Sequence, residues 1–292
     1  MTLKNYWYRL CFLLLILSFT AVLHAAEPPA KKPIRIGLTP VFLEYEGVFI
    51  DEWRVYLERH LGQPVSFVQR GKYRDIVTLL HNKQLDFAWL SGYPYVRNKG
   101  DLHLVAVPLY HGEPLYQSYL IVSSNDNQSR SLADLRRKIF AFSDPDSNSG
   151  YLYVAHLLSD EGEKPSSYFS KTFFTWSHLK VIEAVASGLA QGGSVDGYVW
   201  DTLALAHPEL TSKTRILGKS PQFGQPPFVA SRAVSTKQIV ALQQALFQMT
   251  NDKEGQRLLK ALNLHGFTYS NARLYDTIDE MSRTSNIQTT HP

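Results

Sequence analysis

The segment Phe142–Tyr151 carries the residue types best suited to hold an anion. Ser143, Ser147, Asn148 and Ser149 follow a short apolar run and precede a stretch with helical spacing. At a helix start the first backbone N–H groups have no partner, and the helix dipole is positive there. Hydroxyl and amide side chains beside such N–H groups make a site for phosphate-like anions. Equally, Ser147 or Ser149 can serve only as a cap, with nothing bound.

Three other polar segments follow expected strands and open expected helices. In Trp89–Tyr95, Ser91 holds a cap position and the tyrosine hydroxyls can donate to a ligand or simply pack. Each segment alone is explained by capping, so it is their recurrence that indicates a binding site. The polar residues concerned are Glu44 and Tyr45, Ser91 and Tyr93, and Ser177 and His178.

The sequence lacks the motifs of the common catalytic sites. We find no G-x-S-x-G nucleophile elbow, no H-E-x-x-H zinc motif, no phosphate-binding loop and no dinucleotide fingerprint. The histidines are scattered without metal-ligand spacing. We therefore expect a protein that is no enzyme and needs no cofactor and no metal.

Apolar spacing predicts alternating strands and helices after a polar spacer, which is typical of an α/β fold. The expected strands are Ile34–Leu38, Val65–Gln69, Asp86–Leu90, Leu104–Tyr110, Ile139–Phe142, Lys171–Trp176, Asp196–Trp200 and Thr214–Leu217. The expected helices are Val48–Leu61, Tyr73–Lys83, Ser131–Leu135, Gly150–Ser159, His178–Ser187 and a helical tail over Thr236–Leu262.

Two polar or proline-rich stretches, Ser123–Ser129 and Lys219–Pro227, bracket the middle of the chain. This arrangement predicts two α/β lobes, each a mixed sheet flanked by helices. The first lobe comprises 27–122 plus 228–292, and the second comprises 123–227. We expect the two hinge strands at Gln117–Ser123 and Phe228–Arg232, and the ligand in the cleft between the lobes, where hinge closure traps it.

Residues 1–26 have the order of a secretory signal peptide: a positive start, an apolar run from Cys11 to Leu23, and small residues Ala25 and Ala26. The run is shorter than the roughly 20 residues that span a bilayer. Cleavage after Ala25 and cleavage after Ala26 are both compatible with the sequence. Because Cys11 is the single cysteine, the mature chain would have no thiol chemistry.

The composition is that of a globular protein, with 292 residues, 44% of them hydrophobic and 19% charged. It excludes long disorder, collagen-like repeats and a coiled coil. Residues 1–26 carry Lys4 and Arg9 and no acidic side chain, so their removal lowers the formal net charge from +4 to +2. With no cluster of Lys and Arg elsewhere, nothing indicates nucleic-acid or membrane binding.

Read along the whole chain, these segments resemble the phosphonate, phosphite and phosphate branch of the periplasmic solute-binding proteins of ABC transporters. The matching pieces span nearly all of the mature chain. They are Ile34–Leu38 with Pro40, Glu44-Tyr45, Leu61–Val65, Leu85–Ala88, Ser91–Tyr95, Ser147–Tyr151, Ser177-His178 and Val195–Tyr198.

The resemblance implies a type II two-lobed binding protein, monomeric and periplasmic, that delivers a small tetrahedral oxyanion to an ABC permease. It carries the oxyanion site over to Ser147, Asn148, Ser149 and His178 of the second lobe. Tyr45, Ser91 and Tyr93 of the first lobe would seal it on closure. Asn148 departs from the pattern, because relatives more often have a hydroxyl residue there, and this puts the choice of ligand in doubt.

Asp201 follows Trp200, near where relatives place an acid that contacts a ligand amine or a protonated oxygen. An acid close to an anion requires a proton on one partner or a cationic arm on the ligand, and it can reject a fully deprotonated ion. Asp201 can equally cap a helix over 201–207, and we expect Asp196 to be structural.

Other functions remain open at this point. A sulfonate presents similar oxygens to N–H donors. Tyr93 and Tyr95 are candidates for binding ferric iron, as in transferrin-like periplasmic proteins. Docking of the closed form on a membrane sensor kinase, in place of a permease, is a third alternative.

Overall fold

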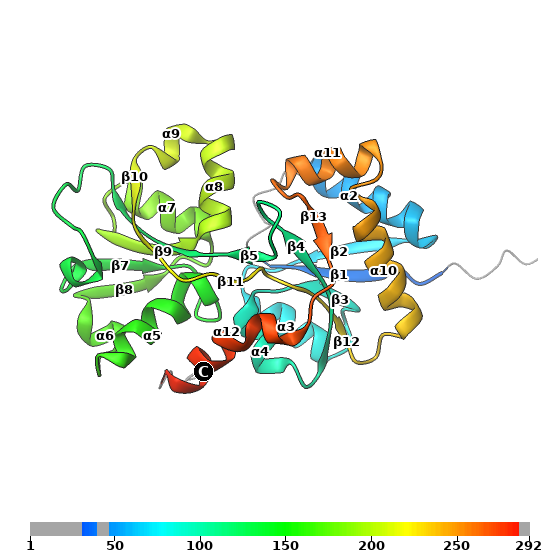
Figure 1. The fold of residues 1–292 in the computed structure, drawn as a ribbon, viewed down its shortest axis with the longest axis horizontal. Coiled ribbons are helices and arrows are strands. Elements are labelled where there is room, and N and C mark those ends of the chain that lie inside the picture. The colour runs from blue at the N-terminus through cyan, green and yellow to red at the C-terminus, as the bar shows by residue number, and fades with distance from the viewer. Residues whose placement is uncertain (1–30, 40–46, 286–292) are drawn as a thin grey trace, which may run out of the picture. The chain divides into compact units, whose positions relative to one another are not determined.

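The computed structural model describes residues 31–39 and 47–285. The described residues from Pro33 to Ser285 belong to one compact unit. The proposed signal peptide, Tyr45 and the chain end after residue 285 lie outside the described residues. Two larger sheets and one two-stranded sheet organise the compact unit, and helices flank the two larger sheets (Figure 1).

The first lobe is built on a six-stranded mixed sheet in the order β13-β4-β12-β3-β1-β2. β1 runs parallel to β2 and β3, whereas β12 runs antiparallel to β3 and β4. The strands are β1 (Ile34–Leu38), β2 (Val65–Gln69), β3 (Phe87–Trp89), β4 (Leu102–Leu109), β12 (Phe228–Ser231) and β13 (Gly266–Thr268).

Helices cover both faces of this sheet, because successive strand residues point to opposite sides. Phe87 and Trp89 pack with Trp53 of α2 on one face, and Ala88 packs with Ile76 of α3 on the other. The first face holds α2 (Gly47–Leu61), α10 (Thr236–Gln248) and α11 (Lys253–Ala261). The second holds α3 (Tyr73–His81), α4 (Gly92–Asn98) and α12 (Asp276–Thr284).

The second lobe is built on a five-stranded sheet in the order β10-β6-β9-β7-β8. Its strands are β6 (Ser118–Ser123), β7 (Ile139–Phe142), β8 (Lys171–Phe174), β9 (Gly192–Asp196) and β10 (Thr214–Lys219). Its helices are η2 (Leu132–Leu135), η3 (Asn148–Leu152), α5 (Tyr153–Asp160), α6 (Pro165–Tyr168), α7 (His178–Ala186), α8 (Gly197–Ala206) and α9 (Pro208–Thr211).

The expected hinge strands lie inside the larger sheets. Residues 118–123 form β6 of the second sheet, and residues 228–231 form β12 of the first. Between them β5 (Leu115–Tyr116) pairs antiparallel with β11 (Phe223–Gly224) as a separate two-stranded sheet. The prediction was therefore shifted by a few residues, because apolar strand character continues from the crossing into each sheet.

The expected strand Asp196–Trp200 is wrong. The strand is β9, which ends at Asp196, and the following residues start α8. Gly192 and Gly193 pair with β7 in mid-sheet, where a Cβ would lie 2.7 Å from Leu135 Cδ1 and 2.5 Å from Val181 Cγ1 respectively. Close packing of helices on both faces thus requires glycines that by sequence indicate a turn.

The C-terminal part of the chain, from α10 onward, differs in part from the prediction. The tail over 236–262 is two helices, α10 and α11, with Asp252 capping the second by accepting from Gly255 N. β13 and α12 then follow, and neither was expected. In the described part of the chain no helix combines the length and apolarity needed to cross a membrane.

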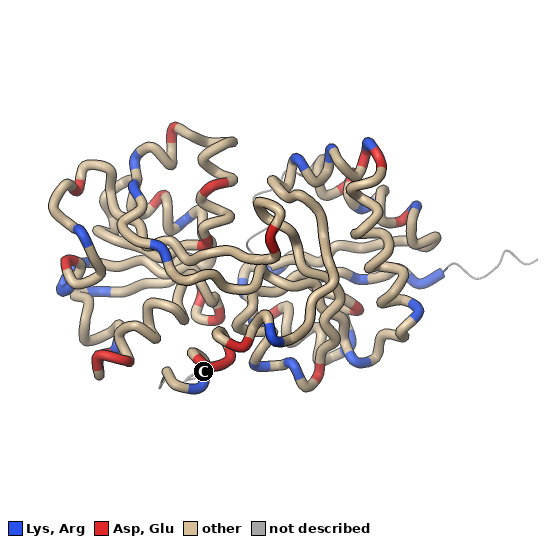
Figure 2. Tube along the Cα trace, in the orientation of Figure 1, with Lys and Arg blue, Asp and Glu red and all other residues tan. Residues whose placement is uncertain are grey.

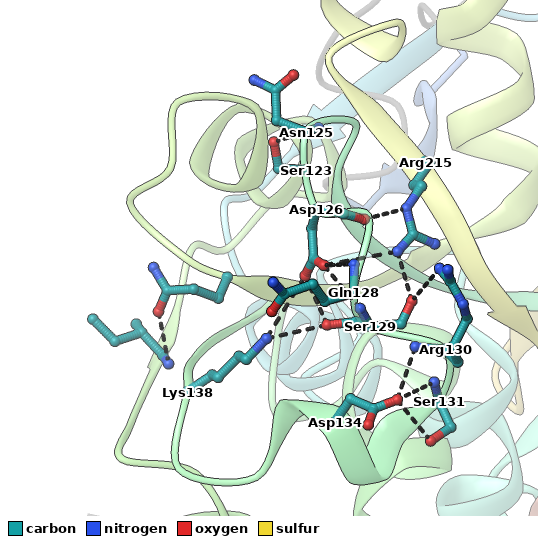
Figure 3. A network of polar contacts seen from close by, with 12 residues as sticks. Ser123, Asn125, Asp126, Gln128, Ser129, Arg130, Ser131, Asp134, Lys138 and Arg215 are labelled. Atoms are coloured by element: carbon teal, nitrogen blue, oxygen red, sulfur yellow. Dashed lines mark hydrogen bonds and ion pairs between the residues drawn. The ribbon is translucent and has the colours of Figure 1, made fainter.

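Charged side chains of both signs are interspersed along the described chain rather than gathered by sign (Figure 2). A network of polar contacts connects the chain between β6 and η2 to β10 (Figure 3). There the Asp126 carboxylate accepts from Ser129 N and Ser129 Oγ, while Arg215 donates to two backbone oxygens.

Candidate functional site

The serine-rich segment opens a helix at the end of β7, as the sequence predicts. Ser147 caps η3, its Oγ accepting from Gly150 N at 3.0 Å. Asn148 and Ser149 are the first residues of η3, and both are buried. A Cβ on Gly150 would lie 1.8 Å from Ser143 Oγ, so only glycine allows this approach of β7 to η3.

Hydroxyl groups from other elements hold this helix start in place. Ser118 Oγ of β6 and Ser194 Oγ of β9 both donate to Ser149 O, at 2.7 and 2.6 Å. Asn148 N donates to Ser91 Oγ at 3.3 Å. Ser91 precedes α4 at the cap position, yet its side chain makes no cap hydrogen bond and contacts η3 instead. The first lobe thus contacts the helix start of the second.

His178 lies at the start of α7 and is buried. Its Nδ1 accepts from Asp196 N at 3.0 Å, which assigns the proton of the neutral ring to Nε2. Nε2 lies 3.3 Å from the hydroxyl of Tyr73 at the start of α3. Burial lowers the pKa of His178 to about 3, so the ring is neutral near pH 7 and offers one N–H donor.

Two buried carboxyl groups belong to the same cluster. Asp144 accepts from Asp146 N at 2.7 Å and from Tyr73 N at 3.2 Å, and burial raises its pKa to about 6. Asp196 caps α8 by accepting from Tyr198 N and Val199 N. Burial raises the pKa of Asp196 to about 8 although these two N–H groups oppose the shift. The cluster therefore holds protonatable acids beside neutral donors.

Two polar atoms of the cluster are buried without a partner among the described residues. These are Ser143 Oγ and Asn148 Oδ1. Because buried polar atoms in folded proteins nearly always form hydrogen bonds, the two atoms indicate a site that is completed by something further. Chemically, the arrangement can bind a small polar group through hydroxyl, imidazole and backbone donors.

The predicted site residues are only partly brought together. Ser91, Ser147, Asn148, Ser149 and His178 share the cluster. The structure adds four residues that the sequence reasoning missed or set aside, namely Tyr73, Tyr116, Asp144 and Asp196. The sequence offered a signal for Asp144, which lies in the segment Phe142–Tyr151, and for Asp196, which lies in the segment Val195–Tyr198.

Tyr93 and Asp201 make their hydrogen bonds outside the cluster, although Tyr93 lies near enough to Asp146 to interact with it electrostatically. Tyr93 is buried in α4 with its ring under the Arg97 guanidinium, 5.7 Å away. Asp201 is in the middle of α8, so it caps no helix, and it accepts from Tyr110 and Tyr119 hydroxyls at 2.7 and 2.8 Å. It lines a separate pocket of about 570 Å³ that shares Tyr116 with the cluster.

We searched the described residues for a group of side chains that could bind a metal ion. Among residues 31–39 and 47–285 no group of three or more His, Cys, Asp and Glu side chains is placed to hold an ion. Tyr93 and Tyr95 are neighbours in α4, and burial raises the pKa of both, which opposes the phenolate form that binds ferric iron.

Comparison with known proteins identifies the family. The family described as the periplasmic substrate-binding protein of the phosphonate ABC transporter matches residues 36–275. The chain belongs to this family. The resemblance seen in the sequence is thereby confirmed, and so is the two-lobed fold.

Individual members of the phosphonate-binding family are distant. A probable ABC transporter phosphite-binding protein, PhnD1 of Prochlorococcus marinus, is 22% identical over 244 residues, covering 79% of this chain and 82% of that protein. The crystal structure of PhnD1 with methylphosphonate has a TM-score of 0.76 at 21% identity, covering 86% of this chain and 97% of that one.

A second solved structure is equally similar in fold. A binding-protein component of an ABC phosphonate transporter from Pseudomonas aeruginosa has a TM-score of 0.77 at 21% identity, with 86% of each chain covered. Membership of the phosphonate-binding family places this chain among periplasmic substrate-binding proteins of transport systems.

Proposed function

We propose that this protein captures a small tetrahedral oxyanion, a phosphonate, phosphite or phosphate, for an ABC importer. One observation carries the proposal: a helix start with buried hydroxyl and amide side chains, closed over by side chains of the other lobe. Helix N-termini and neutral N–H and O–H donors bind such anions well when water is excluded.

In this proposal the second lobe binds first. The η3 N–H groups, Ser147, Ser149 and His178 Nε2–H hold the oxygens. Tyr73 and Ser91 of the first lobe then complete the site, since both already contact the second lobe. Tyr45, which lies outside the described residues, remains a predicted contact. Asp196, next to His178, replaces Asp201 as the proposed acid of the site.

The remaining predictions complete the proposal. Residues 1–26 are removed on export, and the mature chain is a periplasmic monomer. The predicted lobes, 27–122 with 228–292 and 123–227, keep this order, but the first boundary moves to just before β6, which belongs to the sheet of the second lobe. The partner is an ABC permease, and Asp201 belongs to a neighbouring pocket.

The test is titration calorimetry with the mature chain, stripped of carried-over ligand by unfolding and refolding. Methylphosphonate, phosphite and phosphate are the probes, and at least one should bind. Ser149→Ala and His178→Ala should each weaken that binding about tenfold or more, because a charge-assisted hydrogen bond is lost. Ser212→Ala, on the exposed surface, is the matched control. Failure of all three anions to bind would reject the proposal.

A further inference from the structure

Asn148 uses three of its four polar groups inside the protein, and its backbone oxygen accepts from Tyr153 N. Its backbone N–H donates to Ser91 Oγ at 3.3 Å, and its Nδ2 donates to the Tyr116 hydroxyl at 2.9 Å. The residue is 0% exposed. The fourth group, the side-chain oxygen Oδ1, is buried and meets no donor in the described part of the chain.

An amide oxygen in this position can only accept. Because Nδ2 is committed to Tyr116, the face of the amide that carries Oδ1 offers lone pairs and no hydrogen. A buried acceptor without a donor is unfavourable, so the group that fills the site should bring a hydrogen with it.

We propose that the ligand supplies this hydrogen: the tetrahedral oxyanion binds in its protonated, singly charged form and its O–H donates to Asn148 Oδ1. This inference rests on the proposed function and narrows the ligand class. Monoprotonated phosphonates and phosphite qualify. Sulfonates and sulfate do not, because all their oxygens accept and one of them would face Oδ1 acceptor to acceptor.

A side chain with a hydroxyl would not make this distinction. A hydroxyl rotates to donate to a bare oxygen or to accept from a protonated one. Asn148 is therefore the specificity-determining residue, and the neighbouring donors Ser149 and His178 hold the oxygens that both kinds of anion share.

Methylphosphonate and methanesulfonate test this difference directly. On the acid side of the second ionisation of methylphosphonate both ions carry one negative charge and have the same shape, and only methylphosphonate has an O–H. The titratable side chains near the ligand act on both ions in the same buffer. They are Tyr73, Tyr116, Asp144, Asp146, His178 and Asp196. Measured by calorimetry, the wild type should bind methylphosphonate at least about tenfold more tightly than methanesulfonate.

Variants then assign the preference to Asn148. Asn148→Thr should reduce the ratio of the methylphosphonate affinity to the methanesulfonate affinity to about threefold or less, chiefly because methanesulfonate binds better. Asn148→Asp, which keeps acceptors only, should retain a preference. Asn125→Thr, at an exposed asparagine, is the matched control and should leave the ratio unchanged.

Each outcome decides the matter. Equal binding of the two ions by the wild type overturns the inference while leaving the oxyanion function standing. An unchanged ratio in Asn148→Thr overturns the assignment to Asn148. If neither ion binds, and phosphite and phosphate also fail, the proposed function falls and the inference with it.

Discussion

Gly150 is the residue whose replacement should damage the site most directly. Its ideal Cβ position is 1.8 Å from Ser143 Oγ and 3.0 Å from Ser147 Oγ, so Gly150→Ala must push η3 away from β7. We expect a loss of more than about 2 kcal/mol in the free energy of unfolding, together with loss of oxyanion binding. Urea denaturation and calorimetry measure the two effects.

Gly218→Ala is the control for this change. It also replaces a glycine in the second lobe, but nothing lies within 4 Å of its Cβ position. Stability of Gly150→Ala equal to that of Gly218→Ala would show that the loop after β7 relaxes without cost.

His178 should stay neutral throughout the pH range in which the protein is folded. Its pKa in the folded state, about 3, lies below the roughly 6.5 of an exposed histidine. The resulting contribution to stability is complete above about pH 6.5 and is lost as the pH falls from there toward about 3. Nitrogen-15 NMR of the imidazole should show the Nε2–H tautomer at neutral pH, and a titration midpoint near that of exposed histidines would contradict this.

The site could be predicted from the sequence only where a residue sits at a helix start. Ser147, Asn148, Ser149 and His178 share that local pattern, and the structure brings them together. Tyr116 could not be found in this way, because it lies in β5 and not at a helix start. Tyr73 does open α3, but its role comes from contacts with the other lobe, which the local sequence does not reveal. Asp201 was mislocated because the expected strand ran past Asp196, which put Asp201 at a strand end when it lies inside α8.

At the scale of elements, Asp126 is central to how the chain between β6 and η2 is held (Figure 3). Backbone N–H groups of Ser129 and Gln128 and the Ser129 hydroxyl lower the pKa of its carboxyl to about 2. Asp126→Asn should therefore lower the free energy of unfolding by about 1 kcal/mol at neutral pH.

The sign of the pH dependence follows from that lowered pKa. The contribution of Asp126 is present above the roughly 3.9 of an exposed aspartate and is lost as the pH falls toward about 2. Wild type and Asp126→Asn should therefore converge in urea denaturation below about pH 3. A difference that persists there would assign the effect to packing. Asp160→Asn, at a largely exposed helical carboxyl, is the control.

Element prediction succeeded where apolar spacing was regular and failed where packing decided. β1, β2, β7 and α2 agree with the expected ranges to within a residue. β9 was missed because it begins with two glycines, which have low strand propensity and are required here by the close approach of the Leu135 and Val181 side chains. Such a contact between distant residues cannot be predicted from a single sequence, so this part of the fold could be determined only from the structure.

At the scale of the whole molecule, several sets of contacts join the lobes directly, and two of them lie on different elements. At the start of α3, Tyr73 N donates to Asp144, Arg74 Nε lies 3.5 Å from Asp146, and Lys72 stacks over Trp176. At α8, the Tyr198 hydroxyl donates to Leu262 O. The second set lies on residues that take no part in the proposed oxyanion site, so closure can be changed there without altering the groups that hold the ligand.

Thr202 allows this separation to be tested. Its Oγ1 accepts from Asn263 Nδ2 at 3.0 Å, joining α8 to the chain that follows α11. Thr202→Val keeps the shape of the side chain and removes the acceptor. A smaller fraction of the ligand-free protein should then be closed, and the apparent Kd for the oxyanion should rise about 2- to 10-fold. Calorimetry measures the affinity and small-angle scattering the ligand-free dimensions.

Thr78→Val is the matched control, because the Thr78 hydroxyl bonds only to Arg74 O of its own helix. Reduced affinity with larger ligand-free dimensions in Thr202→Val, and neither change in Thr78→Val, is the expected pair of results. Thr202 forms its hydrogen bond with Asn263 and not with a residue of the proposed site. The substitution can therefore weaken ligand binding only by shifting the equilibrium between the open and closed forms. Unchanged affinity in Thr202→Val would mean that the ligand alone, and not contact between α8 and the first lobe, supplies the free energy of closure.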